Sequence, residues 1–485
     1  MTYSFQNLPL GQFEGQTDIG PVEKPGTCKY DVEKQAYTIS GSGANIWGDH
    51  DDFHFVWKRL NGNFILTMRA AFIGTGVSPH RKLGWMARAS LDNGSPHGCA
   101  VAHGDGLVSL QFRRTQGGHT GEARAAIRRV DVIQLERKGN TFIMSVAEYG
   151  QSFTTVQVTD IDLGEEVYAG MFVCSHEADI LEQAVFSNVR IVVPVKDGFE
   201  RGRDPFGSHL ELLDVESGHR QVIYSSEDIF EAPNWRRDGK ALIYNTDGRL
   251  VRFDLATRTP TFIDTGEVVR NNNDHVLSFD GSMLAISSHG EADNASRVYT
   301  VSLQGGKPRL ITPKGPSYLH GWSPDGKFLV YCAERHGQYD VYRIPVGGGD
   351  ETQLTNSPSL DDGPEYTPDG KYIYFNSVRS GRMHVWRMKA DGGEQEQMTD
   401  DEYNNWFPHI SPDGKWVVFI TYLVGEVEAG NHPPAKRVYL RLMPLGGGIP
   451  RVLAYLYGGQ GTMNVPSWSP DGKQLAFVSN TVPYE

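Results

Sequence analysis

Short segments in which apolar and polar residues alternate recur from one end of the chain to the other. Examples are residues 53–57 (FHFVW), 340–344 (DVYRI) and 384–388 (HVWRM). A period of two places successive side chains on opposite faces and is typical of β-strands. Glycine and proline, with 55 and 26 residues, are spread between these segments and favour frequent turns. The pattern therefore predicts an all-β protein built from many short strands.

One turn motif recurs in the second half of the chain. An apolar residue followed by Ser/Thr-Pro-Asp-Gly-Lys occurs at residues 322–327, 366–371, 410–415 and 468–473, with degenerate copies at 235–240 and 277–281. The aspartates of the six copies are 42, 45, 44, 44 and 58 residues apart. Proline presets φ, the aspartate side chain hydrogen-bonds the backbone and glycine accepts a positive φ, so each copy should join two strands. Four strand segments fit into each repeat, which is typical of a β-propeller blade.

The strand count predicts a closed ring of six blades. The last copy, from Met463, leaves room for only two strands before Glu485, while strand patterns at 209–214 and 220–224 precede the first complete copy. We expect the strands after Met463 and the strands that follow Gly207 to form one blade. Their pairing would leave no open sheet edge in the ring. The turn motifs resemble the TolB-like (PD-type, WD-like) propeller repeat over about residues 207–485. That resemblance implies the fold alone, since the family includes binding modules, translocation proteins and enzymes.

The first part of the chain lacks the repeat but still alternates. Segments at 64–68, 107–112, 132–136, 142–146, 167–173 and 189–193 predict an antiparallel two-sheet sandwich. Their order resembles the concanavalin or laminin-G-like jelly-roll modules attached to bacterial carbohydrate-active proteins. The expected organisation is a sandwich over residues 1–193, a linker rich in charge, glycine and proline over 194–206, and the propeller over 207–485.

A group of metal-ligand side chains occurs within the predicted sandwich, at His50, Asp51, Asp52 and His54. In a strand, Asp51 would lie on the opposite face from Asp52 and His54. We therefore expect structural roles for these side chains.

Charge excludes several partners. The chain has 46 Lys and Arg against 59 Asp and Glu, a formal charge of −13, so it should repel phosphate backbones and anionic membranes. No nucleic acid partner and no membrane insertion are expected. The four cysteines lack a CxxC spacing and are expected to be free thiols. Residues 1–11 lack the features of a secretory signal, which predicts a cytoplasmic protein, or a periplasmic one if a signal has been removed.

The position five residues before each repeat aspartate differs between blades. It is proline in four copies and histidine in two, His275 and His320, and His409 lies four residues before its aspartate. We expect these positions to start the inner strands beside the central channel. Because neutral imidazole binds divalent ions, one hypothesis is that the three histidines hold Mn²⁺, Ca²⁺ or Zn²⁺ at the channel mouth. The alternative is that each histidine hydrogen-bonds a neighbouring blade. The remaining metal ligands would come from Asn404, Asn405 or Asp274.

Loops between the second and third strands should rise to the same face. One of them, at residues 422–436, accounts for the longer spacing in the fifth blade and could act as a lid. The catalytic residues predicted from these loops are Arg335, His336, Arg379 and His432. The predicted substrate-binding residues on the same face are Asp274, Asp361, Asp362, Glu365, Tyr403 and Trp406, the two aromatic side chains being suited to stacking on a sugar ring.

A histidine cluster at this place is similar to that of oligogalacturonate lyases. The resemblance implies an acidic oligosaccharide ligand and β-elimination, in which the ion or an arginine neutralises the uronate carboxylate and a base removes the C5 proton. The base would be His336, His432 or Arg379. Two alternatives stay open: a glycoside hydrolase that uses Asp274 with another top-face carboxylate, and a non-catalytic saccharide- or protein-binding propeller.

Overall fold

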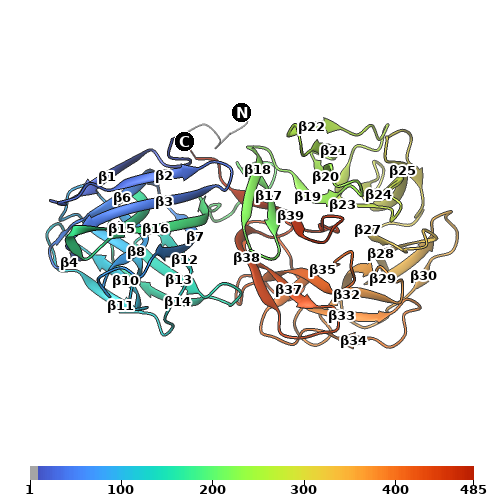
Figure 1. Ribbon diagram of the computed structural model, residues 1–485. Helices are drawn as coiled ribbons and strands as arrows, with labels where there is room; N and C mark the ends of the chain where they lie inside the picture. The colour runs from blue at the N-terminus through green and yellow to red at the C-terminus, as the bar shows by residue number, and fades with distance from the viewer. Residues whose placement is uncertain (1–8, 485) are drawn as a thin grey trace. The chain divides into compact units, whose positions relative to one another are not determined.

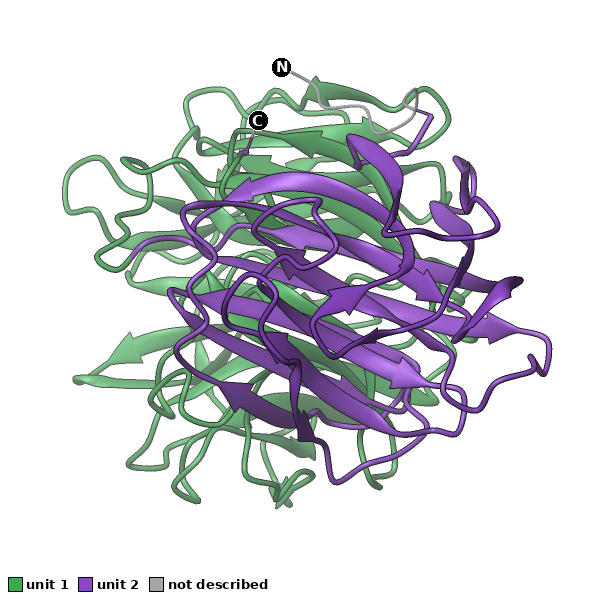
Figure 2. Cartoon of the chain, turned by 90° about the vertical axis from the view of Figure 1, so that its left-hand side faces the viewer, with its two compact units in different colours: residues 1–3, 197–483 green, residues 4–196, 484–485 purple. Residues whose placement is uncertain are grey.

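A computed structural model describes residues 9–484 of the chain, which form two compact units (Figures 1 and 2). Residues 9–196 with Tyr484 form one unit, and residues 197–483 form the other. Strands and turns make up both units, which confirms the predicted all-β class. Within the described range, no helix is long and apolar enough to cross a membrane.

The unit of residues 9–196 is an antiparallel sandwich of two seven-stranded sheets and one separate hairpin. Each segment predicted from alternation lies within one of its strands to within one residue. In sheet order, the first sheet contains β1 (Gly15–Ile19), β6 (Phe53–Asn61), β15 (Glu166–Cys174), β8 (Lys82–Arg88), β9 (His97–His103), β10 (Val108–Arg113) and β11 (Gly121–Arg124). The second contains β14 (Thr154–Val158), β13 (Thr141–Ala147), β12 (Val132–Lys138), β7 (Phe64–Ile73), β16 (Glu177–Val192), β3 (Ala36–Gly43) and β2 (Thr27–Asp31), and the hairpin is formed by β4 (Ile46–Trp47) and β5 (His50–Asp51).

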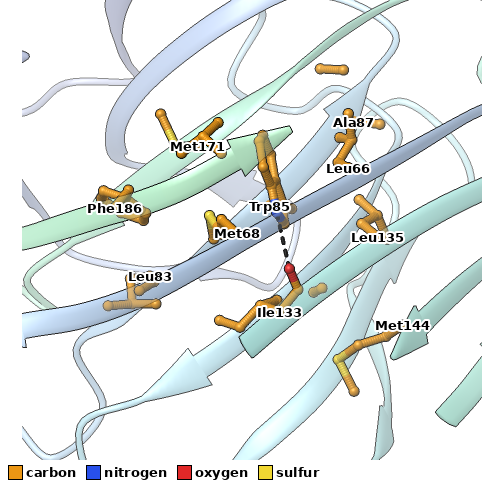
Figure 3. Packing of buried hydrophobic residues seen from close by; sticks show 14 of the residues in the cluster. Leu66, Met68, Leu83, Trp85, Ala87, Ile133, Leu135, Met144, Met171 and Phe186 are labelled. Carbon is orange, nitrogen blue, oxygen red and sulfur yellow. Dashed lines mark hydrogen bonds between the residues drawn. The ribbon is translucent and has the colours of Figure 1, made fainter. Parts of the chain in front are cut away.

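The sandwich core lies between the two sheets (Figure 3). Trp85 of β8 is fully buried at its centre among Leu66, Leu135 and Met171. Its indole Nε1 donates to the carbonyl oxygen of Ile133 across the core, at 3.2 Å. A buried indole N–H needs such an acceptor, and this bond ties the first sheet to the second.

A buried ion cluster lies outside this core, on Asp51 at the end of β5. Both carboxylate oxygens of Asp51 accept from the guanidinium of Arg113, at 2.7 and 2.8 Å, and Arg88 approaches at 3.5 Å. All three side chains are fully buried. His54 lies in β6, with its Nδ1 2.7 Å from Asp18, so Asp51 and His54 belong to different strands and have separate partners.

The unit of residues 197–483 is a propeller of six blades, as predicted. Five blades are four-stranded meanders, and each inner strand contacts the next around the ring. The first blade contains β19 (Glu231–Trp235), β20 (Ala241–Thr246), β21 (Arg249–Asp254) and β22 (Thr259–Phe262). The second contains β23 (Asn271–Leu277), β24 (Met283–His289), β25 (Ser296–Ser302) and β26 (Arg309–Leu310). The third contains β27 (Ser317–Trp322), β28 (Phe328–Arg335), β29 (Gln338–Pro345) and β30 (Thr352–Gln353). The fourth contains β31 (Asp361–Tyr366), β32 (Tyr372–Ser377), β33 (His384–Lys389) and β34 (Glu396–Gln397). The fifth contains β35 (Asn404–Ile410), β36 (Trp416–Tyr422), β37 (Lys436–Pro444) and β38 (Arg451–Gly458).

The repeated turn motif has the geometry that its residues dictate. In the third blade the Ser323 hydroxyl donates to the Asp325 carboxylate at 2.6 Å, and the same oxygen accepts the Lys327 backbone N–H at 3.1 Å. Gly326 has a φ of 70°, a conformation that side chains with a Cβ rarely adopt. These bonds fix the step from the first to the second strand of the blade.

Both ends of the propeller segment build the sixth blade. Its strands are β39 (Gln474–Thr481), β17 (Gly207–Asp214) and β18 (Arg220–Ser226), with a short inner bridge at Trp468. Glu211 of β17 is fully buried and accepts from Arg220 and from the Ser479 hydroxyl of β39, at 2.7 and 2.6 Å. The predicted closure of the ring by strands from both ends is thereby confirmed.

A β-bulge interrupts the inner strand of all five four-stranded blades. Three bulges contain the repeated proline, and the residue before it has a positive φ: 56° at Ala232, 61° at Gly363 and 53° at Phe407. Proline lacks the N–H that a regular ladder requires, so it is accommodated at such irregular positions. The inner strands consequently begin three or more residues before most of the positions that the sequence analysis took as their starts.

Candidate functional site

The three predicted metal ligands each hydrogen-bond a neighbouring blade. His275 is fully buried, and its Nε2 donates to the Ile243 carbonyl oxygen at 3.1 Å. Nε2 of His320 lies 3.1 Å from an oxygen of Asp362. His409 has Nδ1 2.6 Å from Glu365 and Nε2 3.2 Å from the Met463 carbonyl oxygen. These contacts match the alternative in which the histidines hold blades together.

The residues present do not fit the predicted metal site. Across residues 9–484 no three His, Cys, Asp or Glu side chains are grouped so that they could hold a metal ion. Burial lowers the pKa of His275 to about 4, which keeps it neutral, but its Nε2 is already committed to a carbonyl group. Binding of Mn²⁺, Ca²⁺ or Zn²⁺ in another arrangement stays a prediction, and no step below depends on it.

Three of the predicted side chains form a buried acid–base cluster: Asp274, His320 and Asp362. Burial would lower the pKa of His320, but the hydrogen bond and charge of Asp362 outweigh it and raise that pKa. Burial would raise the pKa of Asp362, yet the same bond to His320 holds it below its usual value. Burial and the charge of Asp362 together raise the pKa of Asp274 to about 7, against the opposing effect of His320. Two neighbouring carboxyl groups thus differ in protonation near neutral pH.

The insertion at residues 422–436 brings His432 to this cluster. Its ring packs on Trp406 at a centroid distance of 4.2 Å, tilted by 34°, and lies edge-on to Phe407 at 5.3 Å. Burial lowers the pKa of His432, with Asp362 opposing and His320 adding to the effect. Trp406 is fully buried, so it packs beneath His432 and is closed to a sugar ring in this arrangement.

The other predicted catalytic residues lie apart from the cluster in structural ion pairs or in solvent. Arg335 pairs with Glu351 through two bonds of 2.9 Å, and Arg379 pairs with Asp361 at 2.7 Å. His336 is exposed in the turn between β28 and β29, with a φ of 56°.

Two predicted substrate-binding residues have structural partners as well. Glu365 is held by His409 and by the Ile410 backbone N–H, at 2.6 and 3.0 Å. Tyr403 has the Arg441 guanidinium 4.9 Å from its ring centroid. The structure therefore does not gather these side chains at one site.

A cavity of about 1100 Å³ opens on the face where the inner strands of the first two blades begin. We call it the blade-1 cavity. Its wall includes Glu231 at the start of β19, Asn271 to Asn273 at the start of β23, and Phe262 at the end of β22. Residues 201–206 and Gln460 close its other sides. Asn273 of its wall directly precedes Asp274 in β23, so the cavity adjoins the acid–base cluster.

The blade-1 cavity was not predicted. One signal was available, the run of three asparagines before Asp274, since no other blade has three in a row. The cavity residues come from the segment before the first strand and from three separate loops. Their proximity depends on the closed ring and is not encoded in any local spacing.

Comparison with known proteins identifies the family. The model of the TolB β-propeller domain (PD40) matches residues 320–436. The uncharacterized protein Atu1656 of Agrobacterium fabrum is 44% identical over 272 residues, which cover 56% of this chain and 92% of that protein. The chain belongs to the TolB-like β-propeller family.

Solved structures agree with membership of the TolB-like family. A candidate TolB from Agrobacterium tumefaciens is 44% identical, covers 57% of this chain and 99% of its own, and superposes with a TM-score of 0.55. An oligogalacturonate lyase from Vibrio parahaemolyticus is 12% identical, covers 58% of this chain and 99% of its own, and has a TM-score of 0.36. At that level of similarity the lyase carries no information on activity.

Proposed function

We propose that this TolB-like protein is a saccharide-binding propeller that takes a short oligosaccharide into the blade-1 cavity. The observation that carries the proposal is the cavity itself, whose volume of about 1100 Å³ suits a ligand of a few sugar rings. Five amide and five carboxylate side chains lie in its wall, and these groups pair well with sugar hydroxyl groups.

An aromatic side chain adds an apolar surface to this polar wall. Phe262 is 60% exposed although it lies at the end of a strand, and the Arg249 guanidinium lies 5.5 Å from its ring centroid. An exposed ring beside convergent polar groups provides a stacking platform for the apolar face of a sugar. The sandwich of residues 9–196, which resembles carbohydrate-associated modules, agrees with a saccharide ligand.

The contacts give less support to β-elimination. Neutralising a uronate carboxylate requires a free cation beside it. Arg335 and Arg379 are already paired with Glu351 and Asp361, and His320 is paired with Asp362. Each of these cations is therefore already neutralised by a carboxylate of the protein.

Hydrolysis of a glycosidic bond is a second candidate function, favoured by one observation. Asp274, with a pKa of about 7, can donate a proton near neutral pH, while the pKa of Asp362 is held below its usual value. Glycosidases use such a pair, with one carboxyl group as acid and one as base or nucleophile. In this function Asp274 would protonate the leaving oxygen, and Asp362 would activate water or attack the anomeric carbon.

Replacement of Phe262 by alanine is expected to weaken saccharide binding about tenfold, because stacking on the ring is lost. The measurement is isothermal titration of the full chain with cellotriose, the glucosamine trisaccharide and the galacturonic acid trisaccharide. Leu310→Ala is the matched control, since Leu310 is a 45% exposed apolar residue in β26, the outer strand of the second blade. It should leave binding unchanged.

Incubation with the same trisaccharides separates the three functions. Binding without product formation supports the proposed function, and new reducing ends support hydrolysis. An unsaturated product that absorbs ultraviolet light supports elimination. Absence of binding by every trisaccharide, or equal effects of the two variants, would contradict a sugar site in the blade-1 cavity.

A further inference from the structure

One wall of the blade-1 cavity is a compact turn outside the blades. Residues 199–206, which we call the strap, supply this wall, whereas most other wall residues begin or end strands of the first two blades. Within the strap, the backbone N–H groups of Arg203 and Asp204 donate to the Glu200 carbonyl oxygen at 3.1 and 3.0 Å. The Asp204 carboxylate accepts the Glu200 N–H at 2.7 Å. These bonds hold the turn together without fixing it to a blade.

A single ion pair fastens the strap to the blades. Arg201 Nη2 donates to Glu231 Oε2 at 2.6 Å, and among residues 9–484 this is the one hydrogen bond that joins the strap to a blade strand. Gly202, the next residue of the turn, has open space around it, since a Cβ there would meet no atom within 4 Å. At the other end of the strap, Phe206 is buried and packs on Phe199 at a centroid distance of 5.1 Å. The strap is thus anchored at one end and held at its turn by one contact.

The partner of Glu231 comes from outside its own blade. In the fourth blade Asp361, the first residue of β31, receives its cation from Arg379 in the β32–β33 loop of that blade, at 2.7 Å. Glu231, the first residue of β19, depends on the strap instead. The Glu231 side chain is 6% exposed and the Arg201 side chain 42%. A buried carboxylate needs a cation, which favours the bound strap, while the exposed guanidinium can be released into water.

We propose that the strap is a gate over the blade-1 cavity, latched by the ion pair between Arg201 and Glu231. When the pair breaks, the turn swings about Gly198, which has a φ of 79° and no neighbour that restricts it. The saccharide enters, and the pair forms again over the occupied cavity. The volume of about 1100 Å³ is present with the pair intact, so a ligand fits behind the closed strap. This inference rests on the proposed function and adds control of entry to the same site.

Breaking the latch should change the rates of binding more than the affinity. Stopped-flow fluorescence of the full chain with cellotriose, the glucosamine trisaccharide and the galacturonic acid trisaccharide, each labelled at the reducing end, measures both rates. We expect Arg201→Gln to raise association and dissociation about fivefold and to change Kd less than about twofold, from the typical strength of an ion pair with an exposed partner. Arg252→Gln is the matched control. Arg252 lies in β21 of the same blade, is 43% exposed and pairs with Asp254 at 3.1 Å, so both rates should stay unchanged.

A distance measurement tests the gate without any ligand. Nitroxide labels on Pro205→Cys in the strap and Thr261→Cys in β22, both exposed positions, report opening by double electron–electron resonance. Cys28 is replaced by serine, because the other three cysteines are buried. We expect one main distance in the labelled parent and about fivefold more of a longer distance when Arg201→Gln is added. Arg252→Gln should give the distribution of the labelled parent.

The outcomes separate the gate from the sugar site. Identical distance distributions, or identical rates, in the parent and in Arg201→Gln overturn the gate and leave the saccharide site standing. A change confined to the dissociation rate would make Arg201 a ligand contact and also overturns the gate. Absence of binding by every trisaccharide overturns the proposed function, and the distance measurement then decides on the gate by itself.

Discussion

Replacement of Asp274 by asparagine should stabilise the protein at pH 8 and leave its stability almost unchanged at pH 4. In the folded chain the pKa of Asp274 is raised to about 7, mainly by burial and by the charge of Asp362. An ordinary aspartate in the unfolded chain titrates near pH 3.9. The folded state therefore holds this proton more tightly, and stability declines as pH rises from about 4 to about 7. Asparagine has no such proton to lose.

The expected gain from Asp274→Asn at pH 8 is on the order of 2–4 kcal/mol, from about 1.36 kcal/mol per pKa unit with allowance for relaxation of the site. Thermal unfolding between pH 4 and pH 8 measures it. Asp280→Asn in the turn of the same blade is the control with opposite sign. Hydrogen bonds from Ser278 and Ser282 hold the pKa of Asp280 at about 2, so this variant should lose stability at pH 8. A constant difference between Asp274→Asn and the parent at all pH values would show that Asp274 does not titrate in this way.

Replacement of Asp51 by asparagine is expected to cost about 3–5 kcal/mol of folding free energy, the typical effect of removing one partner from a buried ion pair. Arg113 and Arg88 are fully buried and both lie against this carboxylate. Without it, two buried guanidinium charges would keep only neutral carbonyl and hydroxyl acceptors. Differential scanning calorimetry of the full chain gives the loss, and faster hydrogen exchange in β8, β9 and β10 would assign it to the sandwich.

The neighbouring Asp52 provides the matched control. It is 7% exposed, its Oδ1 has no hydrogen-bond partner, and burial raises its pKa. Asp52→Asn should therefore change stability by less than about 1 kcal/mol or increase it slightly. Similar losses from Asp51→Asn and Asp52→Asn would indicate disturbance of the hairpin and would argue against an uncompensated charge.

The architecture was predictable because its signals are local and repeated. Each Ser/Thr-Pro-Asp-Gly turn specifies its own geometry, and the six copies count the blades. Closure of the ring was predictable because both ends of the propeller segment contain strands that would otherwise lack partners. In the structure these strands pair as β17 with β39. The alternating segments of residues 53–193 likewise predicted seven of the sixteen strands of the sandwich unit.

The site was less predictable because β-bulges and long-range packing determine it. The spacing from the repeat aspartate predicts the face of the sheet on which a side chain lies only where the strand is regular. The inner strands have bulges near His275, His320 and His409, so this prediction fails there. The sequence also placed Arg335 and Arg379 on the expected face but could not show that Glu351 and Asp361 pair with them. Asp274, His320, Asp362 and His432 came together at one place, whereas Arg379 with Asp361 and His409 with Glu365 met as separate pairs.

Closure of the sixth blade from both ends of the segment has a consequence for biosynthesis. Glu211 and its partner Ser479 are 268 residues apart, so β17 leaves the ribosome long before β39 exists. Until then β17 presents a free strand edge, which is a template for pairing with other chains. A truncated polypeptide that ends before residue 474 would form a propeller whose ring stays open. We expect such a product to be bound by chaperones or degraded by proteases.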